Sequence, residues 1–111
     1  MRKELGKIIS VKFGHCGYQD AMLGIQVTLG DGGWGCGDSR CTWDAEIIKH
    51  TEYCEWTEES RDGEYAAIMR YVSKLLKDAK VDSVDKLKNI PIEATFDGTI
   101  LKEWRILTEV L

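Results

Sequence analysis

The spacing of apolar residues changes from a period of two to a period near 3.6 midway along the chain, and this change limits the fold most. Between residues 22 and 29 apolar side chains alternate with polar or small ones, which is typical of a β-strand with one buried face. The residues expected on that face are Leu23, Ile25, Val27 and Leu29. A shorter alternation over residues 9–13 predicts a strand before it, and the turn-forming segment "GHCGYQD" (14–20) separates the two.

After residue 57 the apolar residues recur at intervals of three and four, which predicts one stripe of an amphipathic helix. Thr57 is the expected N-cap, and the negative charges of Glu58 and Glu59 suit the first turn. Gly63 costs about 1 kcal/mol inside a helix relative to alanine, so the regular helix is expected to begin after it. The predicted stripe consists of Tyr65, Ile68, Met69, Val72, Leu75 and Leu76.

Turn signals divide the remaining chain into strands. Residues 34–48 are expected to return as a third strand, kinked or bulged at Gly35 and Gly37. A short helical turn is expected at 83–87, and a strand opened by Pro91 follows it. The "DG" pair at 97–98 predicts a type I′ hairpin. The last strand is expected to pair to the end of the chain, with these residues on one face: Ile100, Trp104, Ile106 and Val110.

These elements predict an α+β domain, an antiparallel sheet of about five strands with one long amphipathic helix packed on it. The 111 residues are expected to form a single domain, 1–111. No apolar run approaches the roughly 18 residues of a membrane span, and no signal peptide is evident, so a cytosolic protein with reduced cysteines is expected. The net charge of −4 argues against polymeric nucleic acid as a partner.

Metal binding and catalysis are both weakly indicated. Six residues are possible zinc ligands, but no C-x₂-C pair occurs among them, so no metal site and no cofactor are expected. The sequence contains no G-x-S-x-G nucleophile elbow. The aspartates near the glycines (Asp31, Asp38 and Asp44) are expected to hydrogen-bond to the local backbone. We therefore expect no enzyme activity. The possible zinc ligands are His15, Cys16, Cys36, Cys41, His50 and Cys54.

The stretch "GDGGWGCGDSRCTW" (30–43) has two interpretations, and it is not a P-loop or a Rossmann fingerprint. It can be a twisted hairpin whose tryptophans cover the core, which composition alone favours. It can instead let a planar anion approach the backbone, with Arg40 as a phosphate donor. Trp104 and Arg105 are neighbours in a strand, so only one is expected to line a given pocket. The candidate ligand residues are Tyr18, Gln19, Asp20, Gly33, Trp34, Gly35, Arg40, Trp43 and Arg105.

Over most of its length the chain resembles short proteins encoded by bacteriophages and prophages. The similar stretches are "KFGHCGYQDAMLGIQVTLGDGGWGCGDSRCTW" (12–43), "YCEWTEESR" (53–61) and "DSVDKLKNIPIEATFDGTILKEWRILTEVL" (82–111). The pattern is similar to that of the phage anti-Thoeris sponge family. This resemblance implies a dimer or larger homo-oligomer in the host cytoplasm that holds cyclic ADP-ribose signals without cleaving them, and in some members cyclic oligonucleotides.

Two hypotheses follow. The first is a non-catalytic binding protein that sequesters a host nucleotide signal. Competing with a host receptor at nanomolar ligand concentration requires a binding free energy of roughly −12 kcal/mol. A small ligand reaches this value only when it is nearly enclosed. A subunit interface is therefore a natural place for the site. The second is an interaction module that blocks a host protein through strand edges or the acidic start of the helix, with or without a structural zinc.

Overall fold

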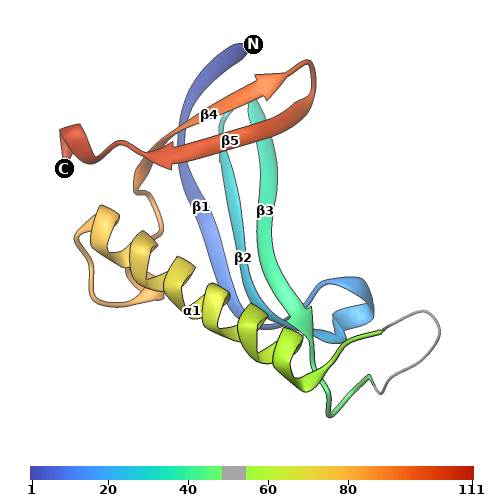
Figure 1. Cartoon of the computed structure of the whole chain (residues 1–111). Helices are drawn as coiled ribbons and strands as arrows, with labels where there is room; N and C mark the ends of the chain where they lie inside the picture. The colour runs from blue at the N-terminus through green and yellow to red at the C-terminus, as the bar shows by residue number, and fades with distance from the viewer. Residues whose placement is uncertain (49–54) are drawn as a thin grey trace.

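The computed structural model describes residues 1–48 and 55–111, which form one five-stranded antiparallel sheet and one long helix. The strand order is β3-β2-β1-β4-β5. Figure 1 shows the sheet curling, with β4 and β5 crossing the upper end of the other strands and α1 in front of their lower half. The predicted α+β class is confirmed. The elements are β1 (Arg2–Cys16), β2 (Met22–Asp31), β3 (Trp34–Trp43), α1 (Glu58–Ala79), β4 (Pro91–Asp97) and β5 (Ile100–Ile106), with 3₁₀ turns η1 (Tyr18–Asp20), η2 (Val84–Lys86) and η3 (Thr108–Val110).

Strand β1 joins two hairpins and is much longer than the predicted strand over 9–13. Its first part, Arg2 to Lys7, pairs with β4, and its second part, Lys7 to Cys16, pairs with β2. Gly14 does not end the strand, because it stays in the ladder opposite Gly24. Because the β2–β3 and β4–β5 hairpins both pair with β1, they cross each other, which leaves a concave side for the helix.

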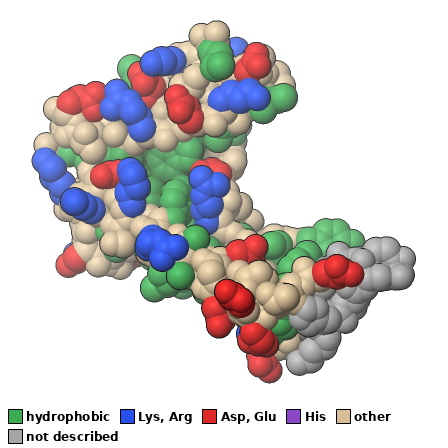
Figure 2. Space-filling model, viewed as in Figure 1, with side chains coloured by type: hydrophobic (Ala, Val, Ile, Leu, Met, Phe, Trp, Pro, Cys, Tyr) green, Lys and Arg blue, Asp and Glu red, His purple; other side chains and the backbone are tan. Residues whose placement is uncertain are grey.

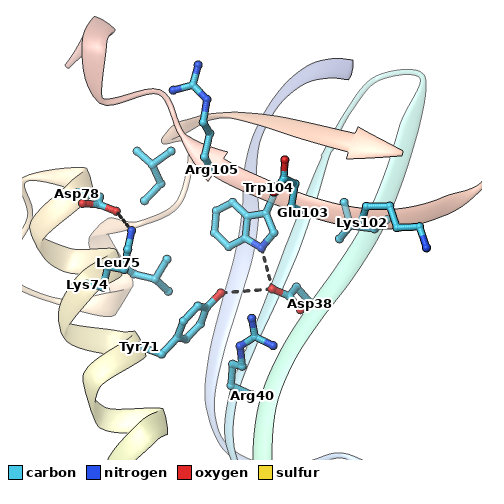
Figure 3. A pocket seen from close by; sticks show the side chains of 12 residues that line it. Asp38, Arg40, Tyr71, Lys74, Leu75, Asp78, Lys102, Glu103, Trp104 and Arg105 are labelled. Atoms are coloured by element: carbon cyan, nitrogen blue, oxygen red, sulfur yellow. Dashed lines mark hydrogen bonds and ion pairs between the residues drawn. The ribbon is translucent and has the colours of Figure 1, made fainter. Parts of the chain in front are cut away.

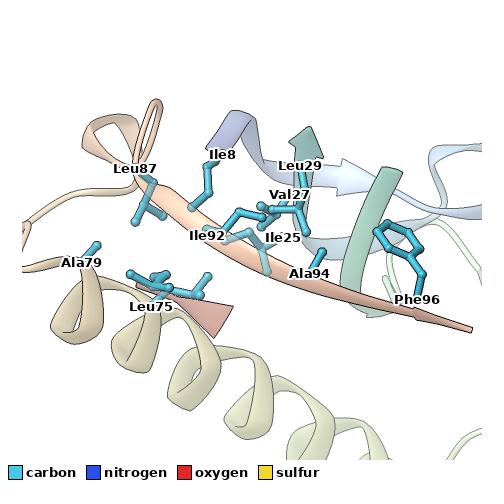
Figure 4. Packing of buried hydrophobic residues seen from close by; sticks show 11 residues of the cluster. Ile8, Ile25, Val27, Leu29, Leu75, Ala79, Leu87, Ile92, Ala94 and Phe96 are labelled. Atoms are coloured by element: carbon cyan, nitrogen blue, oxygen red, sulfur yellow. The ribbon is translucent and has the colours of Figure 1, made fainter. Parts of the chain in front are cut away.

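The hydrophobic core lies between the concave side of the sheet and α1 (Figure 4). Six of its side chains are fully buried with 0% exposure and come from β1, β2, β4 and the segment after η2. The predicted inward face of β4 is confirmed, since Ile92, Ala94 and Phe96 are all buried. On β2 the predicted face is also buried, apart from the half-buried Leu23. The six residues at 0% are Ile8, Ile25, Leu29, Leu87, Ile92 and Ala94.

Helix α1 begins at the predicted cap. The Thr57 side chain accepts a hydrogen bond from the Ser60 N–H, and the Ser60 hydroxyl oxygen accepts one from the Thr57 N–H. The helix starts at Glu58 and contains Gly63, so the expectation of a later start is wrong: the capping box offsets the cost of one glycine. Of the predicted stripe, Met69 is 60% exposed, whereas the others are buried or half-buried. None of the helices in the described part of the chain is long and apolar enough to span a membrane.

Two predicted turn features are wrong. The register between β2 and β3 runs without a shift past Gly35 and Gly37, so β3 has no bulge there. The β4–β5 hairpin forms at the expected place, but its two-residue loop is Gly98–Thr99, because Asp97 pairs with Ile100. Gly98 has a φ of 63° and Thr99 has no positive φ. A type I′ turn needs positive φ at both positions, so this pattern is that of a type II′ turn.

The end of the chain also differs from its prediction. The register shifts between Thr95 and Phe96, whose partners are Glu103 and Leu101, so Lys102 is an extra residue in β5. A bulge of this kind moves the following side chains to the other face. Leu101 therefore packs on the core, while Ile100 is 61% exposed. Strand β5 ends at Ile106, and residues 108–110 form η3 instead of extending the sheet.

Candidate functional site

A groove of about 470 Å³ lies between β3, α1 and β5. Figure 2 shows this hollow, with apolar side chains on its floor and both basic and acidic side chains around it. Strand β5 forms one wall, and β3 and α1 form the others. The groove is lined from β3 by Asp38 and Arg40, from α1 by Tyr71, Lys74, Leu75 and Asp78, and from β5 by residues 101–106.

Asp38 connects the three walls of the groove (Figure 3). The Trp104 indole N–H donates to Asp38 Oδ2 over 2.7 Å, and the Tyr71 hydroxyl donates to the same oxygen over 3.3 Å. Burial raises the pKa of Tyr71 above its usual range, and the Asp38 charge raises it further, although Arg40 opposes the shift. Tyr71 therefore stays protonated at neutral pH and acts as a donor. One carboxylate on β3 thus fixes the side chains of α1 and β5.

Arg40 lies two residues after Asp38, so both side chains point from the same face of β3. Its guanidinium carbon is 5.0 Å from the centre of the Tyr71 ring. Within residues 1–48 and 55–111, no carboxylate lies within 4.0 Å of this guanidinium. Arg40 is exposed and held by the aromatic face, so its hydrogen-bond donors remain open to a ligand. A planar guanidinium presented in this way suits a phosphate or carboxylate.

A second hollow of about 580 Å³ adjoins the groove and shares Arg40, Tyr71 and Lys74 with it. It adds Arg70, another arginine without a carboxylate within 4.0 Å in the described part of the chain. Lys74 itself pairs with Asp78 over 2.6 Å. Together the two hollows form a trough along α1 that is lined by five Lys or Arg side chains and four carboxylates. One of these carboxylates, Glu103, has no ion pair in the described part of the chain.

The structure does not bring the nine predicted ligand residues together. Arg40 and Arg105 line the groove. The Arg105 guanidinium, however, pairs with Glu109 over 2.9 Å and with Glu93 over 3.3 Å, and it points away from the groove in Figure 3. The neighbouring Trp104 side chain points into it, as alternation along a strand requires. Arg40 is thus the predicted residue whose side chain faces the groove.

Three of the nine, Gly33, Trp34 and Gly35, lie at the tip of the β2–β3 hairpin. The Gly33 N–H donates to Asp31 Oδ1 over 2.8 Å, which closes a local turn. The Trp34 ring packs edge-on against Phe96, with ring centres 5.4 Å apart. In this part of the glycine stretch the hairpin interpretation is therefore the better one, because the indole covers the core.

The other four, Tyr18, Gln19, Asp20 and Trp43, lie at the opposite end of that hairpin, since Met22 pairs with Trp43. Turn η1 holds the first three, and Tyr18 is 68% exposed. This turn is thus near one end of the glycine stretch, as expected, but a full strand length from its other end.

The structure also shows where the predicted aspartates lie and whether the possible zinc ligands gather. As predicted, Asp31 and Asp44 bind local backbone N–H groups, those of Gly33 and Glu46. The Glu46 N–H, then His15 at 2.8 Å, lowers the pKa of Asp44 below its usual range. Asp38 instead binds Trp104 and Tyr71. Among the described residues, no three His, Cys, Asp or Glu side chains form a group suited to a metal ion. His50 and Cys54, named as possible ligands, lie outside the described residues.

Sequence reasoning missed the α1 wall of the groove. Tyr71, Lys74 and Asp78 are spaced i, i+3 and i+7, so they share one helix face beside Leu75. This polar spacing is visible in the sequence beside the apolar stripe and is the signal that indicates the wall. Comparisons with protein-family models, with curated proteins and with solved structures find no match to this chain.

Proposed function

We propose that the protein is a non-catalytic binding protein that sequesters a small nucleotide signal in the groove between β3, α1 and β5. The observation that carries the proposal is the Arg40 guanidinium, which lies over the Tyr71 ring with no carboxylate partner in the described part of the chain. Beside it stands the Trp104 indole, held by Asp38. A cation for phosphate and an aromatic surface for a base are the two contacts that a nucleotide needs.

The size and composition of the groove support this proposal. A volume of about 470 Å³ lies within the range of roughly 300–1,000 Å³ for small-molecule sites. Leu75, Leu101 and Ile106 supply apolar walls. Arg70 and Lys74 lie farther along the trough, where a second phosphate of the same ligand would lie. The ligand class proposed is therefore a nucleotide with more than one phosphate.

Sequestration without turnover is proposed because the groove lacks the Ser, Thr or Cys nucleophile with a His base that group transfer most often uses. Its lining residues include no Ser, Thr, Cys or His. The Asp38 carboxylate accepts hydrogen bonds from Tyr71 and Trp104, so its role is to orient these side chains and not to act as a general base. The resemblance to phage anti-Thoeris sponges fits the same chemistry and specifies cyclic ADP-ribose isomers or cyclic oligonucleotides. It also implies a homo-oligomer in the host cytoplasm, and we propose that a second copy covers the open side of the groove.

Calorimetric titration with cyclic ADP-ribose isomers and cyclic oligonucleotides tests the proposal. The Arg40→Gln variant should bind at least tenfold more weakly, because a charge-assisted contact is lost. Lys12→Gln is the matched control, since Lys12 is exposed and lines neither hollow. Heating the complex should release unchanged ligand. Release of a product would mean an enzyme, and equal binding by both variants would place the ligand elsewhere.

A second candidate function is a protein-interaction module that blocks a host protein. The observation that favours it is an apolar hollow formed by β1, β2 and α1, where Phe13 is 49% exposed and Met69 is 60% exposed. Strand β3 also forms one edge of the sheet. This candidate predicts binding to a macromolecule and none to nucleotides. Elemental analysis of the purified protein tests the variant with a structural zinc.

A further inference from the structure

Two thiols that the groove does not use lie next to each other. Cys16 Sγ and Cys41 Sγ are 2.7 Å apart, and neither is in a disulfide. Cys16 is 1% exposed, whereas Cys41 is half-buried. They come from β1 and β3, which are separated in the sheet by β2. Side chains on strands that are not neighbours are normally too far apart to touch.

The curl of the sheet around Gly24 explains this contact. Gly24 in β2 pairs with Gly14 on one side and with Cys41 on the other. A Cβ at Gly24 would lie 2.1 Å from the Arg40 carbonyl oxygen and 2.7 Å from the Cys41 Cα. The absence of a side chain at Gly24 therefore allows β3 to fold closely over β2. This close approach brings the Cys41 thiol to the end of β1, where Cys16 lies.

We propose that Cys16 and Cys41 form a reversible intramolecular disulfide by exchange with a low-molecular-weight disulfide such as glutathione disulfide. The Cys41 thiolate attacks one sulfur of the small disulfide and releases one glutathione thiolate, which takes up a proton. The Cys16 thiolate then attacks Cys41 Sγ in the mixed disulfide and releases the second glutathione. Two protein thiols are oxidised, and one glutathione disulfide is reduced to two glutathione thiols.

Cys41 makes the first attack because it is the more exposed of the two. Burial, followed by the contact with Cys16, raises the pKa of Cys41 to about 12. Since the thiolate is the attacking species, exchange is slow at neutral pH and accelerates as pH rises. The cross-link ties β1 to β3 beside Arg40, and Cys41 lines the second hollow. The disulfide does not depend on the proposed ligand, so either proposal can fail alone.

The experiment incubates the folded protein at pH 8.5 with glutathione disulfide, blocks remaining thiols with N-ethylmaleimide and maps peptides by mass spectrometry. The expected result is a Cys16–Cys41 linked peptide, two fewer blocked thiols and a melting temperature higher by roughly 10 °C, reversed by dithiothreitol. Cys36→Ser should behave like the wild type, because Cys36 lies elsewhere on β3.

Cys16→Ser and Cys41→Ser should each lose the linked peptide and the stabilisation. If either serine variant fails to fold, peptide mapping of the wild type still decides the question. A wild-type protein that keeps all its thiols, that stops at mixed disulfides with glutathione or that links a different pair of cysteines would overturn the proposal.

Discussion

The hydrogen bond between Asp38 and Trp104 should stabilise the fold as well as shape the groove, and a double-mutant cycle can measure it. The perturbations are Asp38→Ala, Trp104→Phe and the two combined. A hydrogen bond to a charged group contributes about 1.5–3 kcal/mol. The Trp104 bond is short at 2.7 Å, but both residues are only half-buried, so the lower half of that range applies.

Asp38→Ala also removes the acceptor of the Tyr71 hydroxyl, whose bond is longer at 3.3 Å. We therefore expect Asp38→Ala to lower the free energy of unfolding by about 2–3 kcal/mol and the melting temperature by about 10 °C. Asp38→Asn keeps an acceptor oxygen and should therefore lower the free energy of unfolding by less than Asp38→Ala. Urea unfolding followed by far-ultraviolet circular dichroism avoids the change in tryptophan fluorescence. A coupling energy of at least 1 kcal/mol is expected, and one below about 0.5 kcal/mol, the size of non-interacting pairs, would refute the reasoning.

Four other changes test the fold. Leu87→Ala, at a core position with 0% exposure, should lower the free energy of unfolding by about 2–5 kcal/mol in urea titration. Thr57→Ala removes the capping box and should cost about 1 kcal/mol by the same assay. Gly24→Ala forces a Cβ against the Arg40 carbonyl and should lower the free energy of unfolding by about 1–3 kcal/mol. A melting temperature equal to that of the wild type would disprove the close approach. The folded-state pKa of Asp44 is below its unfolded value, so its stabilising contribution is present above about pH 4 and is lost as pH falls through the folded pKa. Asp44→Asn should flatten stability over that acid range, which urea midpoints measured from pH 6 to pH 2 would show.

The parts of the fold predicted from sequence are those fixed by neighbours along the chain. Alternation in β2 and β4, the cap at Thr57 and the hairpin at Gly98 are local signals, and the structure contains all of them. The errors occur where a distant strand decides the outcome. The bulge at Lys102 depends on the register with β4 and exchanges Ile100 for Leu101 in the core.

The candidate site was harder to predict for the same reason. Asp38 is 33 residues from Tyr71 and 66 residues from Trp104, and no spacing in the sequence links them. Their contact requires the curl that places β5 opposite β3, which follows from β1 serving two hairpins. Arg40 was identified because its chemistry is visible without the fold. The same kind of chemistry makes the tryptophans of the glycine stretch candidates, but Trp34 packs against Phe96.

The net charge of −4 does not prevent the groove from holding an anion, because two of its three carboxylates are already engaged by other side chains. Asp38 accepts hydrogen bonds from two side chains, and Asp78 pairs with Lys74. Arg40 and Arg70 have no such partners among the described residues. Charges farther away than the Debye length of about 8–10 Å are largely screened, so the five Lys or Arg side chains and four carboxylates that line the trough determine the local potential. Anion binding at this groove should therefore weaken as salt rises, despite the acidic chain.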